Sequence, residues 1–161
     1  MYSFEYNSLS YEGIIKIADF GLVKEMFSQP PFTDYVSTRW YRAPEVILRS
    51  PKYGPPIDIF AVGAIMAELY RMVPIFPGAS EADQIHKICS VLGTPKKEEW
   101  EEGFKLAAQI SFKFHQFLPV PMQSLIPNAS PDAINMIASM LQYNPLKVLV
   151  YFYKLKLPYI Q

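Results

Sequence analysis

The sequence predicts a mainly α-helical domain with a long functional loop in its first third. Residues 59–67 are apolar throughout, as in a helix that is buried on all sides. The segments 80–93 and 130–141 each begin with helix-capping residues and then repeat apolar residues at helical spacing. Between 21 and 56, prolines recur too often for a long regular element, and so long a loop in a compact domain usually has a function.

The first regular element expected along the chain is a short β-strand at residues 14–18, Ile-Ile-Lys-Ile-Ala. Residues 1–13, ahead of it, are polar and aromatic without a clear period and are interpreted as a divergent or truncated head. Residues 14–145 are assigned to one main domain, and 146–161 to a divergent tail. Within that tail, residues 148–157 alternate as a strand would, so an aggregation-prone strand and a helix that tolerates apolar residues both remain open.

Three helices are predicted after the long loop. Asp58 is expected to cap the first, whose body is uninterruptedly apolar. Ser80 is expected to cap the second, which ends at Gly93. Ser130 is expected to begin the third, with Pro131 at the first helical position. The residues predicted to face the core are Ile85, Ile88, Cys89 and Leu92 from the second helix, and Ala133, Ile134, Ile137, Met140 and Leu141 from the third.

The composition argues against several classes of partner. The 15 basic and 15 acidic side chains cancel, so no field of one sign exists to attract nucleic acid or an anionic membrane. The longest apolar stretches are too short to span a bilayer. With a single cysteine, Cys89, and no basic-then-apolar leader, the chain is expected to be an intracellular protein without disulfides. His86 and His115 lack the spacing of metal ligands and are interpreted as exposed or hydrogen-bonded residues.

A set of short motifs occupies the loop and the segment after it. Asp19-Phe20-Gly21 precedes Thr33-Asp34-Tyr35, which is followed by the run from Ser37 to Glu45. In this order they resemble the activation segment of a protein kinase. Together with Pro77-Gly78-Ala79-Ser80 and the run from Leu92 to Lys97, they are similar to the cyclin-dependent and mitogen-activated kinases. Within that group they resemble the male germ cell-associated and intestinal cell kinases, which act in cilia.

This resemblance implies the C-terminal lobe of a protein kinase, with its activation segment and, at residues 78–103, the insert characteristic of this kinase group. The implied reaction transfers the γ-phosphate of ATP to serine or threonine of a protein substrate, with Mg²⁺ bound to the ATP. Asp19 is the residue implied to bind the Mg²⁺ and, through it, the ATP. The implied partners are protein substrates and an upstream activating kinase, and the implied locations are cytoplasm, nucleus or cilium.

The resemblance also implies a role for individual residues. Thr33 and Tyr35 are the implied activating phosphosites, and Arg39 and Arg42 are placed to pair with such a phosphate. The implied substrate pocket consists of Val36, Ser37, Thr38, Arg39 and Trp40, with Thr38 also contacting the catalytic aspartate. The implied structural residues are Glu45, in a buried ion pair with an arginine near the domain's end, Asp58, which braces the catalytic loop, and Gly63.

Several parts of the kinase pattern are not found among the 161 residues. The glycine-rich phosphate loop, the strand lysine with its glutamate partner and the His-Arg-Asp catalytic loop are missing, and with them the small lobe and the catalytic residues. Asn7 echoes the end of that catalytic loop and is an alternative second metal ligand. The isolated chain is therefore expected to bind ATP and Mg²⁺ poorly and to have no measurable kinase activity. Val148 stands where the arginine partner of Glu45 belongs, and Lys147 is the alternative partner.

Two functions remain open from the sequence. The first is an enzyme lineage, the large lobe of a serine/threonine kinase. The second is a non-catalytic binding module or truncated isoform that competes for the partners of a full-length kinase. A third interpretation is that the chain does not fold stably alone, because it exposes the apolar face that meets the small lobe.

Overall fold

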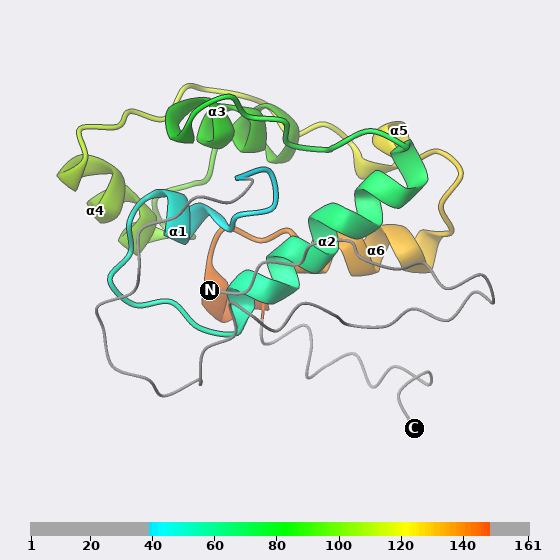
Figure 1. Ribbon diagram of the computed structural model, residues 1–161, viewed down its shortest axis with the longest axis horizontal. Helices are drawn as coiled ribbons and strands as arrows, with labels where there is room; N and C mark the ends of the chain where they lie inside the picture. The colour runs from blue at the N-terminus through cyan, green and yellow to red at the C-terminus, as the bar shows by residue number, and fades with distance from the viewer. Residues whose placement is uncertain (1–38, 149–161) are drawn as a thin grey trace. The chain divides into compact units, whose positions relative to one another are not determined.

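The computed structural model of the chain describes residues 39–148 (Figure 1). This part of the chain is helical, and no strand occurs within it. Its helices are α1 (Pro44–Ile47), α2 (Pro56–Arg71), α3 (Glu81–Leu92), α4 (Glu101–Gln109), α5 (Met122–Leu125) and α6 (Pro131–Met140), and residues 145–148 are helical as well. The expected head, the strand at 14–18 and most of the expected tail lie outside the described residues. No helix within residues 39–148 is both long enough and apolar enough to cross a membrane.

The predicted loop at 21–56 contains a helical turn that the sequence analysis missed. Pro44 stands at the first position of α1, and the turn ends at Ile47. Proline is well tolerated at a first helical position because the amide there has no partner within the helix. The prolines were therefore wrongly taken as breaks throughout. The turn packs against α3 and α4, which are far from it in sequence (Figure 1).

The start of α2 corrects a second prediction. The helix begins at Pro56 and its N-cap is Pro55, and no side chain makes a capping hydrogen bond there. Asp58 therefore lies in the first turn rather than at the cap. The two prolines account for the earlier start, because their fixed φ suits the first turn of a helix. Here the carboxylate still lies near the positive end of the helix dipole.

The core between α2 and α6 depends on a glycine. Gly63 faces α6, and a Cβ placed on it would lie 2.7 Å from the Met140 Cβ and 3.2 Å from the Leu141 side chain. Only a residue without a side chain allows so close an approach. Phe60, Ala64 and Ile137 are buried at this contact side of the two helices. The expectation of an α2 buried on all sides is confirmed only in part, because Val62, Ile65 and Met66 are half-buried and the last turn exposes apolar side chains.

The predicted caps of α3 and α6 are confirmed. The Ser80 hydroxyl accepts a hydrogen bond from the Asp83 amide at 3.1 Å, and the Ser130 hydroxyl accepts one from the Ala133 amide at 3.2 Å. Gly93 ends α3 with a φ of 80°, in the region that favours glycine. Three of the four predicted core residues of α3 are fully buried, namely Ile85, Ile88 and Cys89.

The segment between α4 and α5 runs along α3 without regular structure (Figure 1). Thr94, just after α3, fixes it by side chain and backbone. Its hydroxyl donates to the His115 carbonyl and accepts from the Phe117 amide at 2.8 Å, and its own amide donates to the Phe117 carbonyl at 3.1 Å. A further backbone bond of 2.9 Å joins the Val120 amide to the Val91 carbonyl.

Candidate functional site

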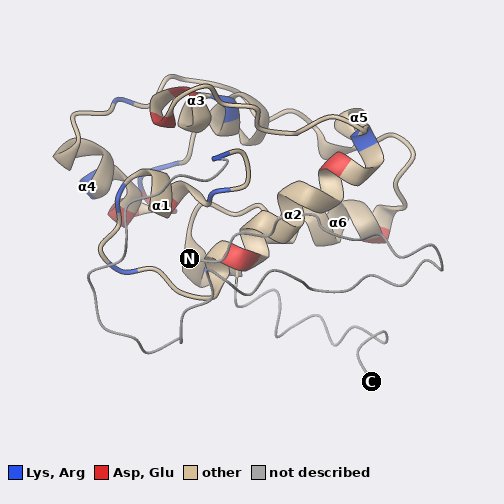
Figure 2. Ribbon diagram, viewed as in Figure 1, with Lys and Arg blue, Asp and Glu red and all other residues tan. Residues whose placement is uncertain are grey.

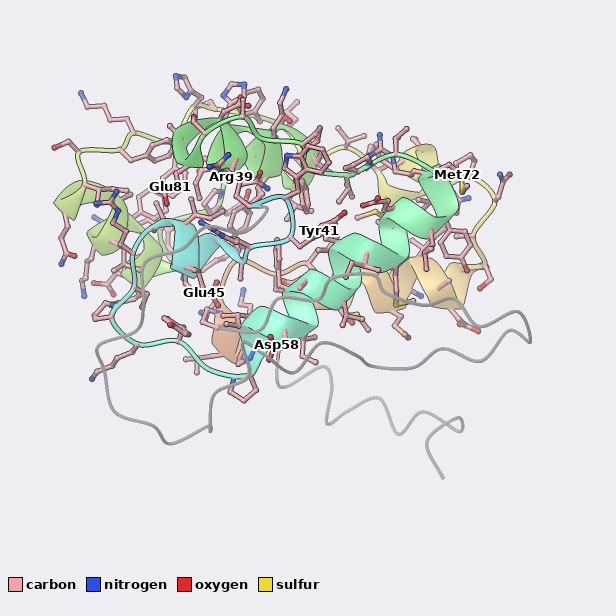
Figure 3. All side chains as sticks on the ribbon, viewed as in Figure 1. Arg39, Tyr41, Glu45, Asp58, Met72 and Glu81 are labelled. Carbon is pink, nitrogen blue, oxygen red and sulfur yellow. The ribbon has the colours of Figure 1, made fainter. Side chains whose placement is uncertain are left out.

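Arg39 and Trp40 lie against the loop that precedes α3. The Trp40 indole Nε1 donates a hydrogen bond to the Gly78 carbonyl at 3.1 Å, and the Arg39 Nη1 donates one to the Ala79 carbonyl at 3.1 Å. The partners are 38 and 40 residues apart in sequence. We call these residues, with Gln84, the Trp40 cluster. Figure 3 shows Arg39 beside α3, on the same side as Glu81.

Gln84 ties the Trp40 cluster together from inside. Its side chain is fully buried, which is unusual for glutamine. The amide Nε2 donates to the Trp40 carbonyl at 3.2 Å, and the Oε1 accepts from the Gly78 amide at 3.0 Å. Both ends of the buried amide are thus hydrogen-bonded, as a stable buried polar group requires.

The loop at Gly78 leaves no room for a side chain. A Cβ on Gly78 would lie 2.5 Å from the Gln84 Cα and 2.7 Å from its backbone nitrogen, and neither atom can move away without shifting the helix. The Ala79 amide donates to the Asp83 carboxylate at 2.8 Å, near the positive end of α3. The first turn of α3 therefore holds the loop at Gly78 and Ala79, which in turn contacts Trp40.

Charged side chains border the Trp40 cluster. The Arg42 Nη1 lies 3.9 Å from one carboxylate oxygen of Glu81, and the Arg49 Nη2 lies 3.4 Å from the other. Nearby, the Tyr41 hydroxyl donates to the Glu68 carboxylate at 2.9 Å and so joins this segment to α2. Figure 2 shows both signs of charge on the helices around this segment, in keeping with the zero net charge.

The structure thus brings together three of the sequence-predicted residues, Arg39, Trp40 and Arg42. The first two lie in the Trp40 cluster, and Arg42 lies at its border next to Glu81. Pairing of the two arginines with a phosphate stays a prediction. The residues predicted for metal binding and phosphorylation, and the rest of the predicted substrate pocket, lie outside the described part of the chain and comprise Asn7, Asp19, Thr33, Tyr35, Val36, Ser37 and Thr38.

Glu45 forms a second, quite different polar site. Its side chain is only 5% exposed, at the start of α1. None of the ion pairs found within residues 39–148 includes it. Burial raises the pKa of this carboxyl from 4.5 to about 7. Lys147, the alternative partner, is exposed, and Val148 is buried.

Asp58 resembles Glu45 in this respect. Its Oδ1 is buried and has no hydrogen-bond partner among the described residues. Burial raises the pKa of this carboxyl from 3.8 to about 7. Figure 3 shows Glu45 and Asp58 on the far side of α1 from Arg39 and Glu81. The two carboxyls with raised pKa therefore belong to a different region from the Trp40 cluster.

Residues 39–148 contain no group of three or more histidine, cysteine, aspartate or glutamate side chains arranged to hold an ion. The rings of His86 and His115 do come together, with centroids 5.5 Å apart, which their distance in sequence did not suggest. The described part thus does not itself form the Mg²⁺ site that the resemblance implies.

Gln84, Gly78 and Glu81 were missed as candidate site residues by the sequence analysis. A glutamine on a helix is normally solvent-facing, so its type gave no reason to single it out. Its position did carry a signal, because Gln84 precedes the buried Ile88 by four residues and so shares its face of α3. A polar residue within an apolar stripe calls for a partner.

Comparisons with known proteins identify the family of this chain. The sequence profile of the protein kinase domain matches residues 6–160. The chain is 58% identical over 148 residues to the serine/threonine-protein kinase MAK of Homo sapiens and 56% identical over 148 residues to the serine/threonine-protein kinase ICK of Mus musculus. Each of these alignments covers 92% of this chain and 24% of the relative. The chain is also 55% identical over 139 residues to the cyclin-dependent kinase F-3 of Oryza sativa subsp. japonica, covering 86% of this chain and 32% of that protein. It thus spans about a quarter of the length of the first two relatives.

Proposed function

Because this chain belongs to the protein kinase domain family, we propose that its residues 14–145 form part of the C-terminal lobe of a serine/threonine kinase domain. In a complete domain of this kind, the reaction moves the γ-phosphate of ATP to a serine or threonine of a protein substrate. Phosphoryl transfer depends chiefly on positioning and on stabilising charge. The contribution proposed for residues 39–148 is the positioning of the protein substrate.

The Trp40 cluster is the observation that carries this proposal. Trp40 is 38% exposed, so part of it faces solvent. Its indole nitrogen is hydrogen-bonded to Gly78, and its carbonyl is hydrogen-bonded to Gln84. A half-exposed aromatic ring with a fixed orientation is suited to receive a small or proline side chain. We assign Arg39 and Trp40 to the wall that contacts the substrate residue after the phosphorylated serine or threonine.

The proposal places the nucleotide elsewhere in the domain. Asp19 is the residue of this chain that would hold Mg²⁺, and Mg²⁺ offsets charge that develops on the transferring phosphate. Residues 39–148 contain no group of side chains arranged to hold a metal ion, so no step of the reaction is assigned to them. Phosphorylation of Thr33 and Tyr35 is proposed as the activating event, and a ciliary location stays a prediction from resemblance.

For the 161 residues in isolation, we propose binding without catalysis. They contain no His-Arg-Asp loop and no glycine-rich phosphate loop, so neither a proton acceptor nor a clamp for ATP is supplied. A chain with an ordered substrate wall and no catalytic loop can still bind the partners of a complete kinase and compete for them.

The two parts of the proposal call for separate measurements. A radiolabelled ATP assay on the 161-residue chain with a generic basic protein should show no transfer above background. Transfer that disappears in Asp19→Ala would overturn the proposal of inactivity. A Ser-Pro peptide titrated into the chain should shift the amide resonances of the Trp40 cluster, and this shift should be lost in Trp40→Ala. If the peptide shifts no resonance of this segment, the proposed substrate wall is wrong.

A further inference from the structure

We propose that Gln84 is a positioning residue that sets the orientation of Trp40, and with it the shape of the substrate wall. This inference rests on the proposed function of that wall. Gln84 does not face the substrate itself, because its side chain has no exposed surface. It acts through the two groups that its amide binds, the Trp40 carbonyl and the Gly78 amide.

Polar contacts hold Trp40 in place. Its ring is only part-buried, so packing alone leaves it free to choose among rotamers. Its orientation is set by polar contacts: the indole donates to Gly78, and the backbone carbonyl accepts from Gln84. Gln84 also binds the Gly78 amide, so one side chain holds both the Trp40 backbone and the residue whose carbonyl accepts from the indole.

No other common side chain fits this position in the same way. Methionine has a similar length but offers neither a good donor nor a good acceptor. Asparagine carries the same amide on a shorter stem. An ionised glutamate keeps the acceptor for Gly78 but loses the donor for Trp40, whereas a protonated glutamate has the shape of glutamine, with one donor and one acceptor.

The arrangement also makes the wall dependent on α3. Gln84 and Asp83 are on the first turns of this helix, and between them they hold the amides of Gly78 and Ala79. A movement of α3 therefore changes the loop and, through it, Trp40. A purely structural role for Gln84 would instead affect the whole domain equally.

The chain offers a direct readout, because it has two tryptophans and therefore two indole N–H resonances. Trp40 is assigned by its loss in Trp40→Phe. Trp100, which is 2% exposed and packs on Tyr143 with ring centroids 5.6 Å apart, is the internal reference. In Gln84→Met, the Trp40 indole resonance should shift and its hydrogen exchange should become about fivefold faster, as expected for the weakening of one ordinary hydrogen bond. The Trp100 resonance should stay in place.

Ser139→Ala is the matched control. Ser139 is another buried polar residue, but it is on α6 and its hydroxyl donates within that helix, to the Met136 carbonyl at 2.7 Å. Its removal should leave both indole resonances unchanged. The control separates the loss of a buried polar group in general from the loss of the support for Trp40.

Gln84→Glu provides a rescue within one protein. At about pH 5, where a buried carboxyl is largely protonated, the Trp40 resonance should match the wild type, and at about pH 8 it should match Gln84→Met. The wild-type chain measured over the same range is the control for the neighbouring charged groups, Arg39, Glu81 and Asp83. A Trp40 resonance that is unchanged in both Gln84 variants overturns the inference, and so does an equal disturbance of both tryptophans.

The peptide titration distinguishes this inference from the proposed function. If Gln84 is a positioning residue, Gln84→Met should weaken Ser-Pro peptide binding about tenfold. Ser139→Ala is the control, measured under conditions in which the two variants are equally stable to urea. If the wild-type chain binds no peptide yet the Trp40 resonance responds to Gln84 as described, the positioning role stands and the proposed function fails.

Discussion

The described part of this chain buries polar side chains in two contrasting ways. In the Trp40 cluster, the amide of Gln84 has no exposed surface and both of its ends are hydrogen-bonded. At the starts of α1 and α2, burial raises the pKa of the Glu45 and Asp58 carboxyls to about 7, although Asp58 is only half-buried. The first arrangement costs little free energy and fixes geometry, whereas the second costs free energy whenever the group is ionised.

The difference shows which contacts this part of the chain completes by itself. The hydrogen bonds that hold Trp40 and Gln84 all come from residues 39–84, whereas the buried Nε of Arg39 has no hydrogen-bond partner among the described residues. The buried oxygen of Asp58 has no partner within residues 39–148. In the family resemblance, Asp58 braces a catalytic loop and Glu45 pairs with an arginine, so both carboxyls fall where the pattern supplies groups that the described residues do not.

The largest expected effect comes from disrupting the Trp40 cluster at Gly78. Gly78→Ala places a Cβ against the backbone of Gln84 and should lower the free energy of unfolding by about 3 kcal/mol. Gly54→Ala is the matched control, because a Cβ there would meet only Pro56, at 3.9 Å. Urea denaturation of the two variants measures the difference. Equal stability of both would show that the loop at Gly78 is not tightly held.

The buried carboxyl of Glu45 should make the free energy of unfolding depend on pH. The folded-state pKa of Glu45 is about 7 and its ordinary value is 4.5, so the folded state binds the extra proton. The associated stability is fully present below about pH 4.5 and is lost as the pH rises toward 7, a change of about 2 kcal/mol between pH 5 and pH 7.5. Glu45→Gln should be more stable than wild type at pH 7.5 and nearly equal to it at pH 4.5.

Urea midpoints of both proteins across this pH range test the sign. Asp58 has a pKa raised in the same direction, so part of the wild-type slope should persist in Glu45→Gln. If the wild type instead becomes more stable as the pH rises from 5 to 7.5, Glu45 is ionised and compensated in the folded chain, and the contrast between the two regions fails.

A smaller effect sharpens the comparison within the helix caps. Ser80→Ala and Ser130→Ala each remove one N-cap hydrogen bond and should each cost about 1 kcal/mol. Only Ser80 lies next to the loop that supports Trp40, so the Trp40 indole resonance should shift in Ser80→Ala alone. Equal shifts in both variants would mean that the indole reports general stability rather than its own support.

The smallest effect is expected at the charged border of the cluster. Glu81 is close to the guanidinium groups of Arg42 and Arg49, but it is exposed and so is Arg49. Glu81→Gln should therefore change the free energy of unfolding by only about 0.3 kcal/mol, and high salt should remove the difference. Thermal melts at low and high ionic strength would detect it, and a loss above about 1 kcal/mol would place Glu81 among the essential contacts of the cluster.

The parts of the fold that sequence reasoning predicted are those with a local cause. Ser80 and Ser130 predict the starts of their helices because an N-cap hydroxyl accepts a hydrogen bond from the amide three residues later. Gly93 announces the end of α3 for a similarly local reason. The prediction that Asp58 caps α2 was wrong because Pro55 and Pro56 already start the helix. The turn α1 was missed because Pro44 was interpreted as a break.

The candidate site was only partly predictable. Arg39 and Trp40 were found through a motif, but their supports, Gly78 and Gln84, are about forty residues away in sequence. No local pattern states that a helix will turn one glutamine inward against that particular loop. The family membership itself was predicted from short motifs and is confirmed by the comparisons.

The segment that Thr94 holds has a consequence for how the chain tolerates change. Between α4 and α5 the backbone has few bonds to itself, yet one threonine and one neighbouring valine fasten it to α3. Because the entropy of closing a loop grows only slowly with its length, the length of chain between Thr94 and His115 is limited less by loop closure than by packing, such as that of Phe114 on Trp100 and Phe104. The bonds of Thr94 set the register of the residues that follow His115.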